Sequence, residues 1–342
     1  MVTIGIDTHK GTLAASAVDE LGRELAQTTV SNTRPAYRRL RHWAEKLGPV
    51  RQWGIEGSGS YGSPFAQVLV AEGETVFEVV PSLTAAERRR ASSRGKTDPI
   101  DALAIARVTL RETRLPRVQQ HSTLDDLKLL VGARDELSAE RTRVANRLHA
   151  DLVILEPGYN ERIRNLRQPR YLREVEAILD GSTGIRAQLA RSRLARLRDL
   201  DPQIATMTTQ LTALVAATGT SLPRLPGVGV INAATILGEA GNVRRYRSAP
   251  AFAAMAGTAP LPASSGKTER HRLNRGGNRQ LNRALHSMAL TQARIHPPAK
   301  AYLERRRAEG KTWREAMRCL KRLLANVVYR TMLADTRAQI GA

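Results

Sequence analysis

Four acidic side chains in the first third of the chain have the types and spacing of a metal site: Asp7, Glu56, Asp98 and Asp101. Asp7 lies in a segment where apolar and polar residues alternate, and Glu56 ends a second such segment, so both should lie on strands. Asp98 and Asp101 begin a helical segment and, three residues apart, share one of its faces. Carboxylates suit divalent cations that stabilise the attacking and leaving oxygens of a phosphodiester displacement. The order and spacing therefore predict a Mg²⁺ site on a ribonuclease-H-like sheet.

Each of these acids also has an ordinary structural explanation. Asp98 precedes Pro99 and could cap the helix, and Asp101 could complete a capping interaction. Asp7 could be a turn residue at the end of its strand. The four acids in this order are harder to explain in that way.

A second set of residues could supply a nucleophile. Ser264 and Ser265 precede Gly266-Lys267 in a polar turn, and Arg270 and Arg272 follow. A serine in such a turn could attack a phosphodiester while the cations hold its oxygens. The same composition is typical of an ordinary polar loop. No His and Asp pattern of a hydrolase triad accompanies it.

A glycine turn in the last third could bind phosphate through its backbone. Gly227-Val228-Gly229 follows Arg224 and is flanked by apolar residues, which is typical of a helix-hairpin-helix segment. Its glycines would let N–H groups approach a phosphate at a helix N-terminus. Glycine-rich turns are common, so this signal depends on its basic surroundings. Arg275 and Arg279 belong to the same basic tract as Lys267, Arg270 and Arg272.

The charge of the chain favours a polyanionic partner. Among 342 residues, 54 Lys and Arg face 32 Asp and Glu, a formal charge of +22. The first 101 residues are nearly balanced, so almost all of the excess lies beyond them. This asymmetry predicts a near-neutral module followed by modules that bind nucleic acid, although solvated Arg-rich helix faces would give the same count. Aromatic residues make up 4% of the chain, which argues against recognition by base stacking alone.

The elements that must position these residues follow from periodicity. Alternation predicts strands at 2–7, 13–18, 25–30, 50–56 and 75–80, and the spacing of apolar residues predicts helices at 34–47, 63–72 and 98–112. This layout is mixed α/β. Heptad-like stripes over 122–155 and 171–217, broken at 181–184, indicate an antiparallel coiled-coil arm for dimerisation or an intradomain helical bundle. Residues 277–337 are helical by periodicity.

Composition also bears on the compartment. A single cysteine, Cys319, excludes a disulfide scaffold and a thiolate zinc site. The first residues do not form a secretory signal, and the longest uncharged run, between Arg247 and Lys267, is broken by prolines. We therefore expect a soluble, cytoplasmic protein with no membrane partner.

Taken together, the motifs resemble those of a known family. Gly5-Ile6-Asp7-Thr8-His9-Lys10, Ile55-Glu56-Gly57-Ser58-Gly59, Lys96-Thr97-Asp98-Pro99-Ile100-Asp101-Ala102 and Leu225-Pro226-Gly227-Val228-Gly229 resemble the DEDD transposases of the insertion-sequence one-ten group, the bridge-RNA-guided recombinases of bacterial mobile elements. The likeness covers almost the whole chain, with four motifs in the right order.

The resemblance implies a fold and a set of roles. The fold would be an N-terminal RuvC-like domain over residues 1–118, coiled-coil dimerisation helices over 119–218 and a helical transposase domain over 219–342. Asp7, Glu56, Asp98 and Asp101 match the family's Mg²⁺-binding tetrad. Ser265 matches its serine nucleophile, with Ser264 as the neighbouring alternative.

The resemblance also implies partners and a setting. These are donor and target DNA, a structured noncoding guide RNA and a homodimer that assembles to a tetramer, in a bacterial cytoplasm with nucleoid association when active. Base pairing would then select sequence, which suits an Arg-rich, aromatic-poor chain.

The sequence analysis thus ends on three hypotheses. The first is a Mg²⁺-dependent, RNA-guided DNA recombinase with a serine nucleophile. The second is a structure-specific endonuclease of the RuvC type, in which the acids alone activate water. The third is a non-enzymatic nucleic-acid-binding protein whose acids are caps and turn residues.

Overall fold

The computed structural model describes residues 1–48, 51–90, 97–166, 168–262, 271–272, 274 and 276–340. It divides into two compact units, Met1–His121 and Ser122–Ala342. The candidate serines Ser264 and Ser265 lie outside the described residues, as do Lys267, Arg270 and Arg275.

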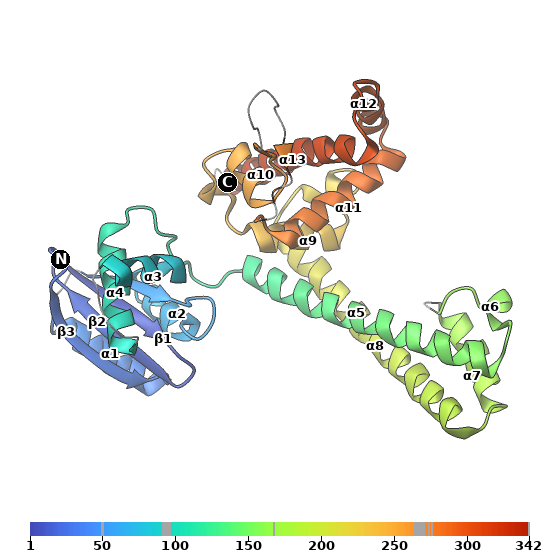
Figure 1. Cartoon of the computed structure of the whole chain (residues 1–342), viewed down its shortest axis with the longest axis horizontal. Helices are drawn as coiled ribbons and strands as arrows, with labels where there is room; N and C mark the ends of the chain where they lie inside the picture. The colour runs from blue at the N-terminus through green and yellow to red at the C-terminus, as the bar shows by residue number, and fades with distance from the viewer. Residues whose placement is uncertain are drawn as a thin grey trace. The chain divides into compact units, whose positions relative to one another are not determined.

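The first unit is built on a five-stranded mixed sheet. Its order is β3 (Glu24–Ser31), β2 (Thr12–Val18), β1 (Val2–Thr8), β4 (Arg51–Glu56), β5 (Thr75–Val79). The three strands from β1 to β3 are antiparallel neighbours, whereas β4 runs parallel to β1 and β5 parallel to β4. Figure 1 shows this sheet in blue at the N-terminus. The predicted mixed α/β layout is confirmed.

Helices cover both faces of this sheet. The alternating aliphatic residues of β1, such as Ile4 and Ile6, pack in one core with residues of α1 (Arg34–Glu45) and α2 (Ser63–Ala71). The opposite face of β1 carries Gly5 and Asp7, and α4 (Asp98–Arg111) packs on it, with α3 (Pro81–Arg90) against α4. The period-two pattern therefore assigns Asp7 to the α4 side of the sheet.

Two paired glycines let α4 lie unusually close to the strands. Gly5 of β1 is paired with Gly54 of β4. A Cβ atom on Gly5 would stand 2.2 Å from the carbonyl oxygen of Ala102, and one on Gly54 would stand 1.8 Å from Oγ1 of Thr109. Any larger residue at either position would push the helix away. The glycines thus determine how closely α4 approaches β1 and β4.

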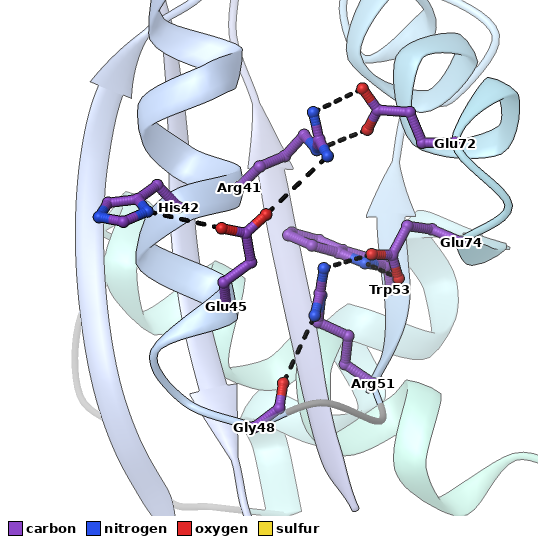
Figure 2. A network of polar contacts seen from close by, with 8 residues as sticks. All are labelled: Arg41, His42, Glu45, Gly48, Arg51, Trp53, Glu72 and Glu74. Atoms are coloured by element: carbon purple, nitrogen blue, oxygen red, sulfur yellow. Dashed lines mark hydrogen bonds and ion pairs between the residues drawn. The ribbon is translucent and has the colours of Figure 1, made fainter.

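A network of ion pairs joins the elements at the other end of the parallel strands (Figure 2). Arg51, the first residue of β4, pairs with Glu74, which also accepts a 3.1 Å hydrogen bond from Nε1 of Trp53. Arg41 of α1 pairs with Glu72 at the end of α2. Arg41 and Glu72 thus join α1 to the end of α2, and Glu74 joins the turn after α2 to β4, far along the strands from Asp7.

The second unit begins with two long antiparallel helices, α5 (Thr123–Leu155) and α8 (Gly184–Ala217) (Figure 1). The buried Arg141 of α5 makes a two-point contact with Asp201 of α8, including an Nη2–Oδ2 distance of 3.2 Å. Further along, Asp151 pairs with both Arg186 and Arg193. Such specific polar contacts fix the register of a helix pair. The short helices α6 (Tyr159–Arg162) and α7 (Pro169–Asp180) connect α5 to α8.

The remaining helices pack around the other end of this pair. They are α9 (Val230–Ala240), α10 (Ala249–Met255), α11 (Arg279–Ile295), α12 (Pro297–Ala308) and α13 (Trp313–Ile340). Between α8 and α10 lie two 3-10 turns, Leu222–Arg224 and Val243–Arg245, and after α10 a short hairpin of β6 (Leu261–Pro262) and β7 (His271–Arg272). One core joins Leu127 and Leu211 of the long pair with these helices.

The helical second unit agrees with the predicted helical character of this region. A domain boundary at 218 and a dimerisation role for the long pair stay predictions. Among the residues that the structure describes, none of the helices is both long and apolar enough to span a bilayer.

Candidate active site

Asp7 and Glu56 lie side by side at the carboxyl ends of two parallel strands. The register of β1 and β4 pairs Ile6 with Ile55, and the two acids are the next residues on each strand. Thr8 donates a 2.7 Å hydrogen bond from Oγ1 to the Glu56 carbonyl oxygen, which joins the two strand ends. Asp7 is 8% exposed, so its carboxylate has little access to water.

The amino end of α4 brings Asp98 to the same place. Nε2 of His9 lies 3.2 Å from a carboxylate oxygen of Asp7 and 3.2 Å from one of Asp98. Ligand atoms of these three residues all lie within 4.8 Å of one another. Thr97 is the N-cap of α4, and it makes no side-chain cap hydrogen bond. Asp98 is thus inside the helix and faces His9, which argues against the capping explanation.

The charges of the other three acids act on Asp7. Burial raises the pKa of Asp7 most strongly; His9 opposes this, and the negative charges of Asp101, Glu56 and Asp98 each raise the pKa further. A carboxylate that is buried among three others is costly to ionise without a nearby cation. The structure therefore brings together the four acids that the sequence singled out.

Two residues of α3 contact the acids and were not foreseen from the sequence. Thr84 donates a 2.7 Å hydrogen bond from Oγ1 to Oε2 of Glu56. Arg88 pairs through Nη1 with the buried carboxylate of Asp101. The two residues are four apart and so share one helix face. Proline is favoured in the first turn of a helix, so Pro81 was the one sequence feature that could have indicated the start of α3.

Asn32, just after β3, ties the turns that follow the two strand-borne acids. Its Nδ2 donates to the carbonyl oxygens of His9 and Tyr61, both at 3.0 Å, and its Oδ1 accepts a 2.5 Å hydrogen bond from the hydroxyl of Tyr37. Its backbone N–H donates to Gly11 at 2.9 Å. One side chain therefore links the turn after Asp7 to the loop after Glu56. No periodic pattern marks such a residue.

The donor set fits a divalent cation. Carboxylates supply the hard oxygen ligands that Mg²⁺ and Mn²⁺ take, and in the compact group they come from Asp7 and Asp98, to which His9 adds an imidazole nitrogen. The repulsion that raises the pKa of Asp7 is the kind that a bound cation relieves. In the structure, the imidazole of His9 and the guanidinium of Arg88 contact these carboxylates.

The residues predicted to bind nucleic acid lie in the second unit. Gly227 has a positive φ of 80°, and a Cβ there would stand 2.9 Å from the Met288 carbonyl oxygen, so this glycine is needed for close packing against α11. Gly229 is the N-cap of α9, and no atom lies within 4 Å of its Cβ position. The described arginines of the predicted set, all of them exposed, are Arg224, Arg272 and Arg279.

Comparison with protein families gives two matches. A profile of DEDD transposases of the IS110 type, described as a transposase, matches residues 4–157, which include all four acids. A profile of the transposase IS116/IS110/IS902 family matches residues 219–304.

Comparison with individual proteins finds relatives of similar length. The uncharacterized 44.8 kDa protein of insertion element IS116 from Streptomyces clavuligerus is 27% identical, over 98% of this chain and 95% of its own. The uncharacterized 43.6 kDa protein of insertion element IS110 from Streptomyces coelicolor is 27% identical, over 98% of this chain and 94% of its own. Among solved structures, T. thermophilus RuvC in complex with Holliday junction substrate matches at 16% identity over 34% of this chain and 99% of that chain, with a TM-score of 0.28.

Proposed function

The chain belongs to the DEDD transposases of the IS110 type and is a DNA transposase, and from that premise we propose that its acidic cluster is the strand-cutting centre of a Mg²⁺-dependent, RNA-guided recombinase. The observation that carries the proposal is the convergence of Asp7 with Glu56, Asp98 and Asp101 at one end of the sheet. A set of structural caps and turn residues would have no reason to meet there.

The four acids would hold the metal. A divalent cation bound to them supplies charge stabilisation for the attacking and leaving oxygens of a phosphodiester displacement. Around the acids, Thr84 orients Glu56 through its hydrogen bond, and Arg88 forms an ion pair with Asp101. Both contacts restrict where the carboxylates point, which is the requirement for a preorganised site.

The nucleophile that we propose is Ser265, with Ser264 as the neighbouring alternative. Its Oγ would form a bond to the phosphorus of the scissile phosphodiester while the bond from phosphorus to one DNA oxygen breaks. The proton of the serine would end on the oxygen that leaves. The number of phosphodiester bonds is unchanged in this step, so the linkage can be passed to a second DNA strand without hydrolysis. Lys267, Arg270, Arg272 and Arg275 would bind phosphate oxygens nearby.

The proposed partners follow from the same family. They are donor and target DNA, a structured noncoding guide RNA and further copies of the chain, which would form a homodimer that assembles to a tetramer. The setting would be the bacterial cytoplasm, at the nucleoid.

The test is recombination between a donor and a target plasmid in the presence of the noncoding RNA of the element. We expect Asp7→Asn, and the double variant Ser264→Ala with Ser265→Ala, each to abolish the product. Glu112→Gln is the matched control, since it neutralises a half-buried acid that pairs with Arg111 just beyond the far end of α4. Full activity of the double serine variant would overturn the nucleophile, and full activity of Asp7→Asn would overturn the metal site.

A second candidate function is a structure-specific endonuclease. It is favoured by the fact that the acidic cluster lies wholly within the first unit and could act on water without a serine. The two are separated by a suicide DNA substrate that traps a covalent intermediate. A protein–DNA adduct lost in the double serine variant supports the recombinase, whereas free hydrolysed ends with no adduct support the endonuclease.

A further inference from the structure

A half-buried lysine on α13 lies among cations in the second unit. Nζ of Lys321 donates a 2.6 Å hydrogen bond to Oδ1 of Asn282 on α11. The amide of Asn282 has a determined orientation, because Nδ2 donates to the carbonyl oxygens of Ala256 at 2.8 Å and Gly257 at 3.0 Å. Lys321 therefore points at the place where the chain leaves α10 for the β6–β7 hairpin.

Two more basic side chains lie on the adjacent helix turns. His286 follows Asn282 by four residues on α11, and Arg318 precedes Lys321 by three on α13, so each shares a face with its partner. Burial lowers the pKa of Lys321, and Arg318 lowers it further. Burial likewise lowers the pKa of His286, with Lys321 as the second cause. We call Lys321, His286 and Arg318 the α11–α13 basic cluster.

Among the described residues, no ion pair balances the cluster, although the charge of Glu315, three residues before Arg318 on α13, interacts with Arg318. Across the described ranges of the chain, no carboxylate lies within ion-pair distance of Lys321, His286 or Arg318. This differs from Arg141, Arg193 and Arg283 in the same unit, each of which pairs with an aspartate. An ammonium has three N–H donors, and the hydrogen bond to Asn282 uses one of them. A partly desolvated cation with spare donors and no counter-ion is stabilised when an anion binds to it.

We propose that the α11–α13 basic cluster is a binding site for a phosphodiester group of duplex DNA. Lys321 donates to a phosphate oxygen, and Arg318 and His286, which are exposed, line the approach from solvent. The inference rests on the proposed function for its choice of ligand. It goes beyond that function because Lys321, His286 and Arg318 lie outside the basic tract that the sequence singled out.

The experiment compares full-length wild type with Lys321→Gln in binding to a fluorescent DNA duplex over a range of KCl concentrations. Glutamine keeps an N–H donor for Asn282 and removes the charge. We expect the slope of log affinity against log salt to become shallower by about 1, as for one lost phosphate contact. Lys300→Gln removes an exposed lysine of α12 and is the matched control for loss of one surface charge. Equal thermal unfolding of the three proteins shows that the fold is intact.

The outcomes separate this site from the proposed function. A slope for Lys321→Gln equal to that of wild type, or changed no more than that of Lys300→Gln, overturns the site even if the protein recombines DNA. A slope change seen with an RNA duplex and absent with DNA also overturns it. Conversely, if wild type binds DNA with the expected change in Lys321→Gln but never breaks a strand with Mg²⁺ present, the site stands and the proposed function fails.

Discussion

Asp7 is the acid of the cluster for which ionisation in the folded protein is unfavourable. It is buried at the end of the central strand, and its pKa is raised by burial and by the three other acids. An unfolded chain ionises Asp7 at its ordinary pKa of 3.8, so the folded state binds this proton more tightly. Folding stability without metal must therefore fall as pH rises from that value through the raised pKa, and the loss persists at neutral pH.

The first prediction concerns Asp7→Asn in the absence of metal. We expect this variant to unfold at a temperature a few degrees above wild type at pH 7, because the amide is not charged. The difference should shrink as pH falls from the raised pKa to well below 3.8, where Asp7 of wild type is protonated in both states. Mn²⁺ should raise the unfolding temperature of wild type and leave that of Asp7→Asn nearly unchanged.

The measurement is thermal unfolding followed by circular dichroism at several pH values, with a chelator and then with Mn²⁺. Glu112→Gln is the control. If Asp7→Asn is less stable than wild type at pH 7 without metal, the carboxylate has a structural partner and the electrostatic account is wrong.

Some residues of the candidate site can be predicted from local sequence patterns, and others cannot. Asp7 and Glu56 could be found because alternation along β1 and β4 predicts both the strand and the face. Asp98 and Asp101 could be found because Asp-Pro marks a helix start. His9, Asn32, Thr84 and Arg88 contact or position the acids through tertiary hydrogen bonds and ion pairs, which leave no period in the sequence.

At the scale of the element, the site depends on how α4 lies against the sheet. The helix was predicted from its own sequence, but its closeness to β1 follows from the pairing of Gly5 with Gly54, which depends on strand register. Helix α3 was missed because its short, Arg-rich segment after Pro81 has no apolar stripe. These are tertiary properties, and local patterns do not contain them.

The second prediction is that Gly5→Ala displaces α4. The added Cβ would meet backbone atoms of Ala102 and Ala106 at 2.2 Å, and backbone cannot move aside as a flexible side chain can. We expect a loss of stability of about 3 kcal/mol, at the upper end of overpacking costs. Metal-dependent strand cleavage should fall with it, because Asp98 and Asp101 move with the helix.

Gly59→Ala is the matched control for this change. No atom lies within 4 Å of the Cβ position at Gly59, and its φ is not in the left-handed region. Its stability should stay within about 0.5 kcal/mol of wild type. Chemical denaturation of both variants gives the two values, and a Gly5→Ala protein as stable as Gly59→Ala would refute the close packing.

The third prediction concerns the turns that carry His9 and Tyr61. Asn32→Ala removes both hydrogen bonds that tie these turns together. Since the turns follow Asp7 and Glu56, we expect Mn²⁺ affinity to fall roughly tenfold, the low end of what loss of a supporting contact costs a metal site. Electron paramagnetic resonance titration of free Mn²⁺ measures it.

The control for Asn32→Ala is Ser60→Ala, which removes a side-chain hydrogen bond within the loop after Glu56 but none between the two turns. Unchanged Mn²⁺ affinity in Asn32→Ala, in a protein that unfolds at the wild-type temperature, would show that the tie does not position the acids.

At the scale of the whole molecule, the candidate metal ligands lie in one unit and most of the excess positive charge lies in the other. The cores of the first unit are drawn from Val2–Val118 and those of the second from Leu124–Leu333, with no buried cluster shared between them in the described parts of the chain. Ser122–Ala342 carries 37 Lys and Arg against 19 acids, while all four candidate metal ligands lie in Met1–His121. The charge asymmetry that the sequence showed therefore coincides with a structural division. Units with separate cores are expected to fold independently.

The fourth prediction is that the two units carry separable activities. Ser122–Ala342 expressed alone should bind duplex DNA with a salt dependence close to that of the whole chain, since it holds most of the positive charge. Met1–His121 should bind Mn²⁺ with near-native affinity and bind DNA at least tenfold more weakly at 0.1 M salt. Neither fragment alone should recombine DNA, because each lacks either the acids or the candidate serine.

Anisotropy and Mn²⁺ titrations of each fragment measure DNA binding and metal binding, with circular dichroism to confirm that each fragment is folded. A first unit that binds DNA as tightly as the whole chain would show that the acidic site and its own surface hold the substrate, and that the basic second unit serves another partner.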